Sequence, residues 1–333
     1  MSQPPTIDAQ SAALLLARTH EATTALRAMI AKAVVGQGDV VDGLLATLFA
    51  RGHALLVGVP GLAKTLLVSS LARSLDLSFG RVQFTPDLLP ADITGTDVLA
   101  QEDERRRLVF ARGPIFHNLV LADEINRTPP KTQSALLEAM QERRVTVGTT
   151  THALPDPFQV FATRNPIEQE GTYALPEAQL DRFLLELHVG YPSEHDELEI
   201  ARRTTSGVIP KIEPVMTLDE VRAVGELVPR VPITDEALAL AVRLARTSRP
   251  TDAKAPSEVR DYVRFGAGPR GSQALVLAAK ARAVVFGEAA ADVGDVRAMA
   301  TAALRHRLVL SYRAEADGVR DADVVAALLR ASV

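Results

Sequence analysis

The sequence contains no cysteine and no tryptophan, and aromatic residues make up only 4% of its 333 residues. The absence of cysteine excludes disulfides, thiolate metal sites and cysteine nucleophiles, and is consistent with a reducing compartment. The shortage of aromatic side chains weighs against a stacking platform for single-stranded nucleic acid. The histidines are scattered without the spacing of a zinc site. The available chemistry is therefore that of hydroxyl, carboxylate, amide and basic groups.

The chain also lacks a strong net charge and a long apolar run. Its formal net charge of −4 gives no global reason to expect a surface that coats nucleic acid. No apolar run reaches the roughly 18 residues that a membrane-spanning helix needs. The first ten residues, MSQPPTIDAQ, do not have the basic and apolar blocks of a secretory signal. We therefore expect a cytoplasmic protein without a membrane span, long enough for two domains.

Short apolar strands alternate with helical patterns through residues 11–191. Helices are predicted at residues 11–33, 38–50, 64–75, 131–142 and 177–183, and strands at 53–57, 79–84, 118–123, 158–163 and 183–189. This alternation predicts an α/β layer built on a mostly parallel sheet. Two segments interrupt it, residues 94–114 and 143–161, and both have the strand-like arms of a β-hairpin. The runs EDERRR and GTTTHAL are predicted at the hairpin tips.

The remaining segments have a different character. Residues 1–10 are polar and are predicted to form a flexible tail. Residues 192–217 contain scattered prolines and are predicted to be a linker that carries one helix. From residue 218 to residue 333 the pattern is helical, which predicts an all-helical second domain. The residues near the predicted helix starts that could act as N-caps are Asp219, Thr234, Ser272, Asp292 and Asp321.

The stretch GVPGLAKT, Gly58 to Thr65, stands between a predicted strand and a predicted helix. It matches the phosphate-binding pattern G-x-x-x-x-G-K-[ST] except at the residue before the lysine. In such a loop, backbone N–H groups and a helix N-terminus point at the phosphates, the lysine reaches the terminal phosphates, and the threonine hydroxyl can bind Mg²⁺. The alternative is an ordinary strand–turn–helix junction. The predicted cofactor-binding residues here are Gly58, Val59, Pro60, Gly61, Leu62, Ala63, Lys64, Thr65 and Leu66.

The residue that departs from the pattern is Ala63, where the motif has glycine. Gly58 and Gly61 supply backbone freedom, and Pro60 restricts one φ angle. Alanine adds one methyl group. We expect Ala63 to be compatible with the loop if its φ angle is negative.

Two adjacent carboxylates, Asp123 and Glu124, follow the apolar strand NLVLAD. An acid at a strand end can hold Mg²⁺, and a second acid can polarise an attacking water. The alternative is a pair of solvated acids that cap the next helix. Together with Lys64 and Thr65, the pair predicts a nucleotide site with metal ligands Thr65 and Asp123.

These residues resemble the AAA+ ATPases, and more closely their MoxR-type branch. The resemblance covers most of the chain and is densest in GVPGLAKT, FTPDLLPADITG, GPIFHNLVLADEINRTPPKTQSALLEAMQE, ATRNPIEQEGTYALPEAQLDRF and GPRGSQALVLAAKARA. It implies a P-loop NTPase core with two β-hairpin inserts, over residues 11–191, followed by a helical lid at residues 218–333. It also implies that Ala63 is typical of the branch. One departure is Arg164, where the family pattern has glutamine.

The resemblance assigns roles to the residues of the two motifs. It implies that Lys64 and Thr65 bind phosphate and Mg²⁺, that Asp123 completes the metal shell, and that Glu124 is the general base. Asn165, at the end of the strand FQVFAT, resembles the first sensor, which orients water or reads the γ-phosphate. An Asn-Pro turn is the local alternative.

Two arginines resemble further catalytic residues of the family. Arg182 in LDRF is similar to the arginine finger donated to a neighbouring subunit, although locally it could pair with Asp181 or Glu186. Arg127 is a second candidate for this role. Arg270, in GPRGSQAL, resembles the second sensor at the start of a lid helix that faces the nucleotide, and its alternative is a solvated loop arginine.

The segment VVGQ, which includes Val35 and Gln37, resembles the stretch whose backbone contacts adenine, although its valines could simply be core residues.

The resemblance implies Mg²⁺-dependent ATP hydrolysis by a homo-oligomeric ring, expected to be a hexamer, that remodels or matures a client protein. It also implies a partner with a von Willebrand factor A domain and contact between the hairpin inserts and clients. Two alternatives remain open. One is a nucleic-acid motor, which the charge and the low aromatic content disfavour. The other is a module that binds nucleotide without hydrolysing it, which the combination of Glu124, Asn165 and Arg182 disfavours.

Overall fold

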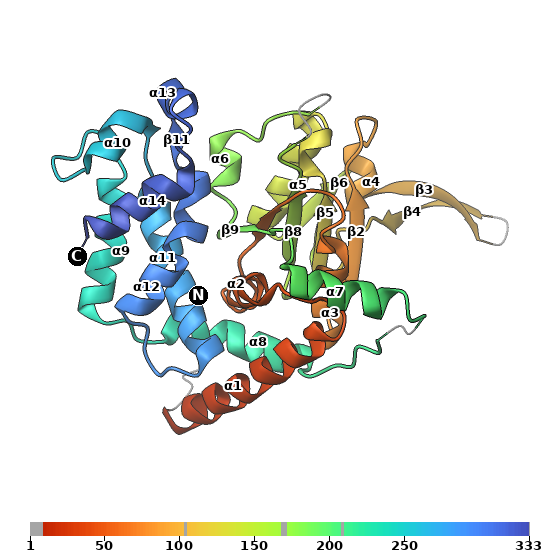
Figure 1. The fold of residues 1–333 in the computed structure, drawn as a ribbon. Helices are drawn as coiled ribbons and strands as arrows, with labels where there is room; N and C mark the ends of the chain where they lie inside the picture. The colour runs from red at the N-terminus through yellow and green to blue at the C-terminus, as the bar shows by residue number, and fades with distance from the viewer. Residues whose placement is uncertain (1–8, 103–104, 168–171, 208–209, 333) are drawn as a thin grey trace.

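A central sheet of five parallel strands organises the computed structural model, which describes residues 9–102, 105–167, 172–207 and 210–332 (Figure 1). The strands are β1 (Ala54–Val57), β2 (Phe79–Gln83), β5 (Leu119–Asp123), β8 (Gln159–Arg164) and β9 (Leu185–His188). Their order across the sheet is β2–β5–β8–β1–β9, and every neighbouring pair is parallel. The predicted parallel sheet is confirmed.

The inner strands β1, β5 and β8 are buried and largely apolar because the sheet is covered on both faces. In β1, Leu56 belongs to the core under α2 (Gly38–Phe49) and α3 (Lys64–Ser74). Leu55 belongs to the core under α4 (Pro90–Thr94) and α5 (Pro130–Glu142) on the opposite face. Side chains alternate between the faces of a strand, so the run ALLV supplies both cores. Because the five strands are parallel, their carboxyl ends all lie at one end of the sheet, where polar side chains can gather. This end is called the carboxyl edge below, and the opposite end the amino edge.

Both predicted hairpins are present. β3 (Gly95–Glu102) pairs with β4 (Arg105–Arg112), and this long ribbon projects from the body of the molecule (Figure 1). β6 (Arg144–Val147) pairs with β7 (Thr150–Ala153). The rings of Phe110 and His152 stack with centroids 3.9 Å apart, which ties the two hairpins together. Residues 103 and 104 of EDERRR lie outside the described residues, and most of GTTTHAL belongs to strand β7.

Helix α1 (Ala9–Ala31) runs along both parts of the molecule (Figure 1). Its first two residues were expected in the tail but are helical, and residues 1–8 lie outside the described residues. The hydroxyl of Thr23 donates to the Val285 carbonyl in the second domain at 2.9 Å, while Leu26 is part of the core shared with α3. Helix α1 therefore packs on both units.

The described part of the second domain is mostly helical. Its helices are α8 (Leu218–Leu227), α9 (Asp235–Thr247), α10 (Ser257–Tyr262), α11 (Pro269–Phe286), α12 (Val293–Leu304), α13 (Tyr312–Ala316) and α14 (Asp321–Arg330), and the predicted linker helix is α7 (Glu194–Thr204). The prediction of an all-helical domain misses a short antiparallel ribbon, β10 (Val263–Phe265) with β11 (Val309–Leu310). These runs are too short for a periodic signal, and only the tertiary fold brings them together.

The predicted helix caps are confirmed only in part. Thr234 and Asp292 accept the expected backbone hydrogen bonds at the starts of α9 and α12. The N-caps of α8, α11 and α14 are Thr217, Gly268 and Arg320, so Asp219, Ser272 and Asp321 were wrong. The true α8 start is a capping box between Thr217 and Glu220.

The two units share one apolar core. Buried residues of α2 and β9 join those of α11 and α12 in a single cluster, which holds the second domain against the β9 edge of the sheet. The short helix α6 (Glu177–Leu180) and the turn η3 (Arg305–Arg307) meet at the same boundary. Among the described residues, no helix combines the length and apolarity needed to cross a membrane.

Candidate nucleotide-binding site

The carboxyl ends of β1, β5 and β8 surround a cavity of about 420 Å³. Its lining consists of Pro60, Gly61, Leu62, Ala63, Lys64, Thr65, Leu66, Asp123, Glu124, Thr163 and Asn165. The loop 58–65 follows β1 and leads directly into α3, and its residues from Pro60 onward line the cavity together with the start of the helix. The structure thus brings together the loop, the acidic pair and Asn165, as the sequence predicts.

The two glycines of the loop serve different purposes. Gly61 has a φ angle of +86°, which glycine adopts without steric cost. Gly58 lies so close to β9 that an added Cβ would stand 2.6 Å from the Val189 carbonyl oxygen. Gly61 therefore shapes the loop, whereas Gly58 permits close packing of the loop base.

The expectation for Ala63 is wrong. Its φ and ψ angles are 54° and 21°, in the left-handed region, at the N-cap of α3. For an L-residue with a Cβ this conformation costs roughly 1–2 kcal/mol relative to the right-handed one. The loop therefore has the backbone conformation that glycine would adopt more easily, and Ala63 adopts it with some steric strain.

Lys64 is folded back on its own loop. Its Nζ donates to the carbonyl oxygens of Gly58 and Val59, each at 2.7 Å. Partial burial lowers the pKa of Lys64, and the negative charges of Asp123 and Glu124 oppose this shift. The ammonium group is therefore bonded to the loop carbonyls and lies within the electrostatic reach of the acidic pair.

Asp123 is 9% exposed and has partners on both of its oxygens. Its Oδ1 accepts from the Thr163 hydroxyl at 2.6 Å. Its Oδ2 accepts from Arg81 Nη2 at 2.7 Å and lies 3.5 Å from the Thr65 hydroxyl. One carboxylate and one hydroxyl facing the same space are hard oxygen ligands, which suit Mg²⁺ completed by phosphate and water. The donor set fits that ion.

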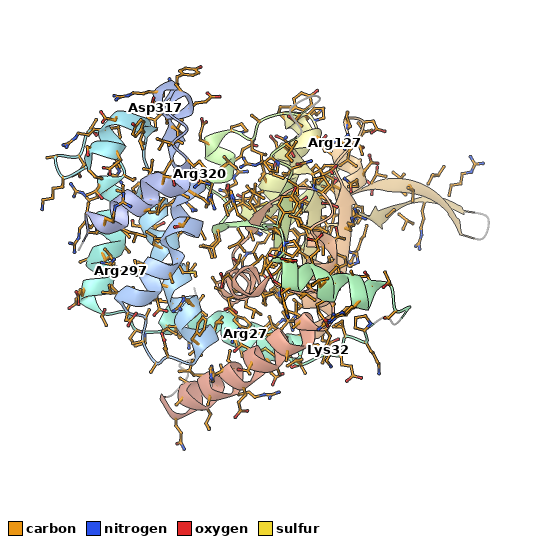
Figure 2. The ribbon with its side chains drawn as sticks, in the orientation of Figure 1. Arg27, Lys32, Arg127, Arg297, Asp317 and Arg320 are labelled. Atoms are coloured by element: carbon orange, nitrogen blue, oxygen red, sulfur yellow. The ribbon has the colours of Figure 1, made fainter. Side chains whose placement is uncertain are left out.

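Glu124 also has a positive φ angle, 57°, with ψ of 49°. Its backbone N–H donates to Thr163 Oγ1 at 2.8 Å, and its Oε2 accepts from Gln83 Nε2 at 2.9 Å and Arg127 Nη1 at 3.0 Å (Figure 2 labels Arg127). Non-glycine residues in this region are uncommon and are often found at functional sites. The carboxylate is thus held by two donors from its own chain, and Arg127 is engaged within the chain.

Sequence reasoning missed three residues that organise the acidic pair. Thr163 bonds Asp123 through its hydroxyl hydrogen and Glu124 through its hydroxyl oxygen. Arg81 and Gln83 are two residues apart on β2, so their side chains point to the same face of the sheet. Gln83 is paired in register with Asp123. The available signal was the polar alternation R-V-Q in a strand that adjoins the acidic strand end.

Asn165 is 6% exposed and lines the cavity. Its Oδ1 accepts from the backbone N–H of Ile167 at 3.1 Å, which is the bond expected of a local Asn turn. Both interpretations of this residue therefore have support. The neighbouring Arg164 places Nη2 3.8 Å from Oε1 of the buried Glu186, and its carbonyl accepts from Gly58 N–H at 3.2 Å.

Arg182 lies at the amino ends of the parallel strands, whereas Lys64 lies at their carboxyl ends. It precedes β9, whereas the loop follows β1, and the two strands are parallel. The two local partners considered for Arg182 are bound elsewhere. Asp181 pairs with Arg307 at 2.8 Å, and Glu186 lies 2.7 Å from His188.

Arg270 is at the second position of α11, after Pro269, as predicted. Its Nη1 is 3.8 Å from Asp181 Oδ2, and its side chain is 61% exposed. Together with Arg182 and Arg307 it lines a cavity of about 330 Å³ at the amino ends of β1 and β9. Among the described residues, those lining the Lys64 cavity do not include Arg270. The expectation that it faces the nucleotide of its own chain is therefore not met in this conformation.

The segment VVGQ lies near the start of α7. Gln37 Nε2 donates to the Gly190 carbonyl at 3.1 Å, and Gly36 has a φ angle of +76° beside Asp196. Val34 is buried in the main core, whereas Val35 is only partly buried. Val35 and Gln37 do not line the described part of the Lys64 cavity.

Comparison with known proteins places this geometry in a family. Residues 53–185 match the model of the ATPase family associated with various cellular activities (AAA), and residues 255–328 match an AAA lid domain. The chain is 42% identical to Chaperone MoxR1 of Mycobacterium tuberculosis over 90% of this chain and 79% of that protein. It is 32% identical to Protein MoxR of Methylorubrum extorquens over 95% of each chain. A solved structure from Cytophaga hutchinsonii superposes with a TM-score of 0.89 at 38% identity, covering 96% of this chain and 97% of that one. The chain belongs to the MoxR-type branch of the AAA+ ATPases.

Proposed function

We propose that this protein hydrolyses ATP in a Mg²⁺-dependent reaction whose active site is completed by a second copy of the chain. The observation that carries the proposal is the single cavity shared by Lys64, Thr65, Asp123 and Glu124. A lysine, a hydroxyl and two acids in this arrangement are the parts that phosphoryl transfer to water requires. A module that only binds nucleotide would not need Glu124 at that position.

Each group has a defined task. The loop N–H groups and Lys64 bind the phosphates, and Thr65 and Asp123 would hold Mg²⁺, which neutralises charge on the phosphate oxygens. Glu124 accepts a proton from the attacking water as the bond from that water to the γ-phosphorus forms, and ADP leaves. Gln83 and Arg127 hold Oε2 of Glu124 and so orient the carboxylate, whose other oxygen can accept the proton of the water.

Among the described residues, Lys64 is the only cation that lines the cavity, and no arginine lines it to meet the charge that develops on the γ-phosphoryl oxygens. Arg182 and Arg270 lie together at the other sheet edge, beside Asp181. A ring, which we propose to be a hexamer, would place this edge of one subunit against the Lys64 edge of the next. Arg182 is then the finger in trans, and Arg270 accompanies it. The roles of Asn165 as a sensor and of Val35 and Gln37 beside adenine belong to the same proposal.

Mixing two inactive variants tests the shared site. Glu124→Gln and Arg182→Ala are each expected to reduce turnover strongly, by about 10²–10⁴-fold for a lost base and about 10³–10⁵-fold for a lost finger. Mixed rings contain interfaces at which a native base faces a native finger, so combining the two variants should restore measurable ATPase activity. The matched control is a variant that carries both substitutions on the same chain, because none of its interfaces pairs a native base with a native finger.

Two results would contradict this proposal. Full turnover by Glu124→Gln would show that another group is the base. No recovery in rings shown by labelling to contain both variants would show that the site is not shared.

We also propose that hydrolysis drives remodelling or maturation of a client protein, which the name of the relative Chaperone MoxR1 supports, and that the protein acts in the cytoplasm. A partner with a von Willebrand factor A domain, contacted by the projecting hairpin, fits this view. Under this proposal, DNA or RNA leaves the ATPase rate unchanged, and a large stimulation would favour a nucleic-acid motor instead.

A further inference from the structure

The guanidinium of Arg81 occupies the oxygen of Asp123 that faces the predicted metal position. Arg81 Nη2 is 2.7 Å from Asp123 Oδ2, and this same oxygen is 3.5 Å from the Thr65 hydroxyl. The other oxygen, Oδ1, is taken by Thr163 at 2.6 Å. Arg81 therefore holds the carboxylate oxygen shared with the other predicted metal ligand.

Arg81 is also connected to Glu124. Its Nη2 donates to Gln83 Oε1 at 2.8 Å, and Gln83 Nε2 donates to Glu124 Oε2 at 2.9 Å. These bonds fix which end of the Gln83 amide faces which partner, because only the oxygen accepts and only the nitrogen donates. One arginine thus links the metal-ligand acid to the acid that acts as the base.

We propose that Arg81 is an internal cation that competes with Mg²⁺ for Asp123. This inference rests on the proposed function. Asp123 is nearly buried, so its negative charge is stabilised by a nearby cation, and in the described conformation Arg81 supplies one. Two cations on the same carboxylate oxygen would repel each other. Metal binding therefore requires Arg81 to leave, and release of Asp123 also removes the bond geometry that orients Gln83.

The surroundings of Arg81 allow this exchange. Its side chain is 49% exposed, so it can swing into solvent without leaving a charge buried. Because the arginine of this ion pair is half exposed, the pair is expected to alter metal affinity only a few-fold. The competition is therefore weak enough for Mg²⁺ with nucleotide to prevail, but strong enough to measure.

A positioning role for Arg81 would have the opposite sign. If Arg81 held Asp123 in the orientation that the metal needs, its removal would weaken metal binding. If it competes, its removal strengthens metal binding. The direction of the change in metal affinity therefore decides between the two roles.

The experiment measures how strongly Mn²⁺, a spectroscopic substitute for Mg²⁺, enhances ADP binding to the full chain. ADP affinity is determined with and without Mn²⁺, and bound Mn²⁺ is followed by electron paramagnetic resonance. For Arg81→Gln we expect the Mn²⁺ enhancement to rise about two- to fivefold, the factor that a half-exposed ion pair represents. Arg81→Lys keeps the charge and should stay closer to the wild type.

Two controls isolate the effect. Arg144→Gln removes an exposed arginine that pairs with Glu142 at 3.2 Å, away from the site, and should leave the enhancement unchanged. Gln83→Leu keeps the contact between Arg81 and Asp123 and should change the enhancement by less than the Arg81→Gln variant does. Equal melting temperatures establish that the variants fold.

An unchanged or smaller Mn²⁺ enhancement in Arg81→Gln would overturn the proposal. So would an equal increase in Gln83→Leu, since the effect would then not pass through Asp123. If the wild-type chain bound no ADP with Mn²⁺, the proposed function itself would fail, and this result is separate from the sign of the Arg81 effect.

Discussion

The two edges of the central sheet differ in how they are built. At the carboxyl edge, Ala63 and Glu124 both have left-handed backbones, and Lys64 lies beside two acids around a cavity. At the amino edge, the side chains of Arg307 and His306 are buried against the backbone carbonyl of Phe183. The carboxyl edge is formed by loops of the α/β domain alone. The amino edge is held by hydrogen bonds from the helical domain.

The difference matters for the proposed reaction. The carboxyl edge has the groups that bind phosphate and activate water, whereas the amino edge has exposed or half-exposed arginines beside a rigid support. Arg182 follows Asp181, and Asp181 is bound by Arg307 from η3. The helical domain therefore directly contacts the residue that precedes Arg182. A ring would convert this contact into communication between neighbouring sites.

The largest effect is expected from removing the fastening at the amino edge. The side chain of Arg307 is 4% exposed, and its guanidinium donates to Asp181 Oδ1 at 2.8 Å, Phe183 O at 2.8 Å and Leu184 O at 3.2 Å. Arg307→Ala removes this donor from Asp181 and Leu184, while the Phe183 carbonyl keeps its contact with His306. Since breaking a buried pair costs about 3–5 kcal/mol, we expect a loss of that size in the free energy of unfolding, measured by urea denaturation.

The matched control for that variant is Arg320→Ala. Arg320, which is labelled in Figure 2, pairs with Asp323 at 3.1 Å, and its side chain is 78% exposed. An exposed pair contributes about 0–1 kcal/mol, so this variant should unfold almost like the wild type. Similar losses in both variants would mean that the amino edge is not fastened by Arg307.

Lowering the pH is expected to reduce the free energy of unfolding by a somewhat smaller amount. His53 is buried at the amino edge, where Nδ1 accepts from Val160 N–H at 2.9 Å and Nε2 donates to the Met140 carbonyl at 3.2 Å. Burial lowers the pKa of His53 from 6.5 to about 4, and the nearby Arg143 adds to this shift. Burial likewise lowers the pKa of His306.

The sign of the pH dependence follows from these values. Between pH 6.5 and 4 the unfolded chain protonates His53 while the folded chain does not, so the unfolded state binds more protons. Stability is therefore complete above pH 6.5 and falls as the pH drops towards 4, by about 3 kcal/mol from His53. Urea denaturation at several pH values across this range gives the slope of the unfolding free energy against pH. This slope should be shallower in His53→Gln, whereas His195→Gln, which removes an exposed ring, should keep the wild-type slope. An unchanged slope in His53→Gln would contradict the assignment.

The sequence predicted the carboxyl edge better than the amino edge, for a physical reason. Lys64, Thr65, Asp123 and Glu124 come together because parallel strands all end at the same edge, so strand order hardly affects their convergence. The pairing of Asp181 with Arg307 joins residues far apart in the chain, and no local pattern encodes it. Thr163, Arg81 and Gln83 were missed because their role depends on the register between neighbouring strands.

The backbone of Ala63 was also mispredicted, since the identity of a residue does not determine its φ angle in a constrained loop. This strain gives the smallest of the expected effects. Ala63→Gly should remove roughly 1–2 kcal/mol of left-handed strain and lose roughly 0.5–1 kcal/mol to the greater flexibility of glycine in the unfolded chain. We therefore expect a net gain of about 0.5–1 kcal/mol in the free energy of unfolding.

The control for this gain lies in the same helix. Ala72 is buried in α3 with no left-handed backbone, so Ala72→Gly should destabilise the protein by about 1 kcal/mol through the poor helix propensity of glycine. Urea denaturation of both variants compares the same substitution in two backbone conformations. Opposite signs would establish that strain is stored beside Lys64. If Ala63→Gly were as destabilising as Ala72→Gly, the loop before Lys64 would hold no strain at this residue.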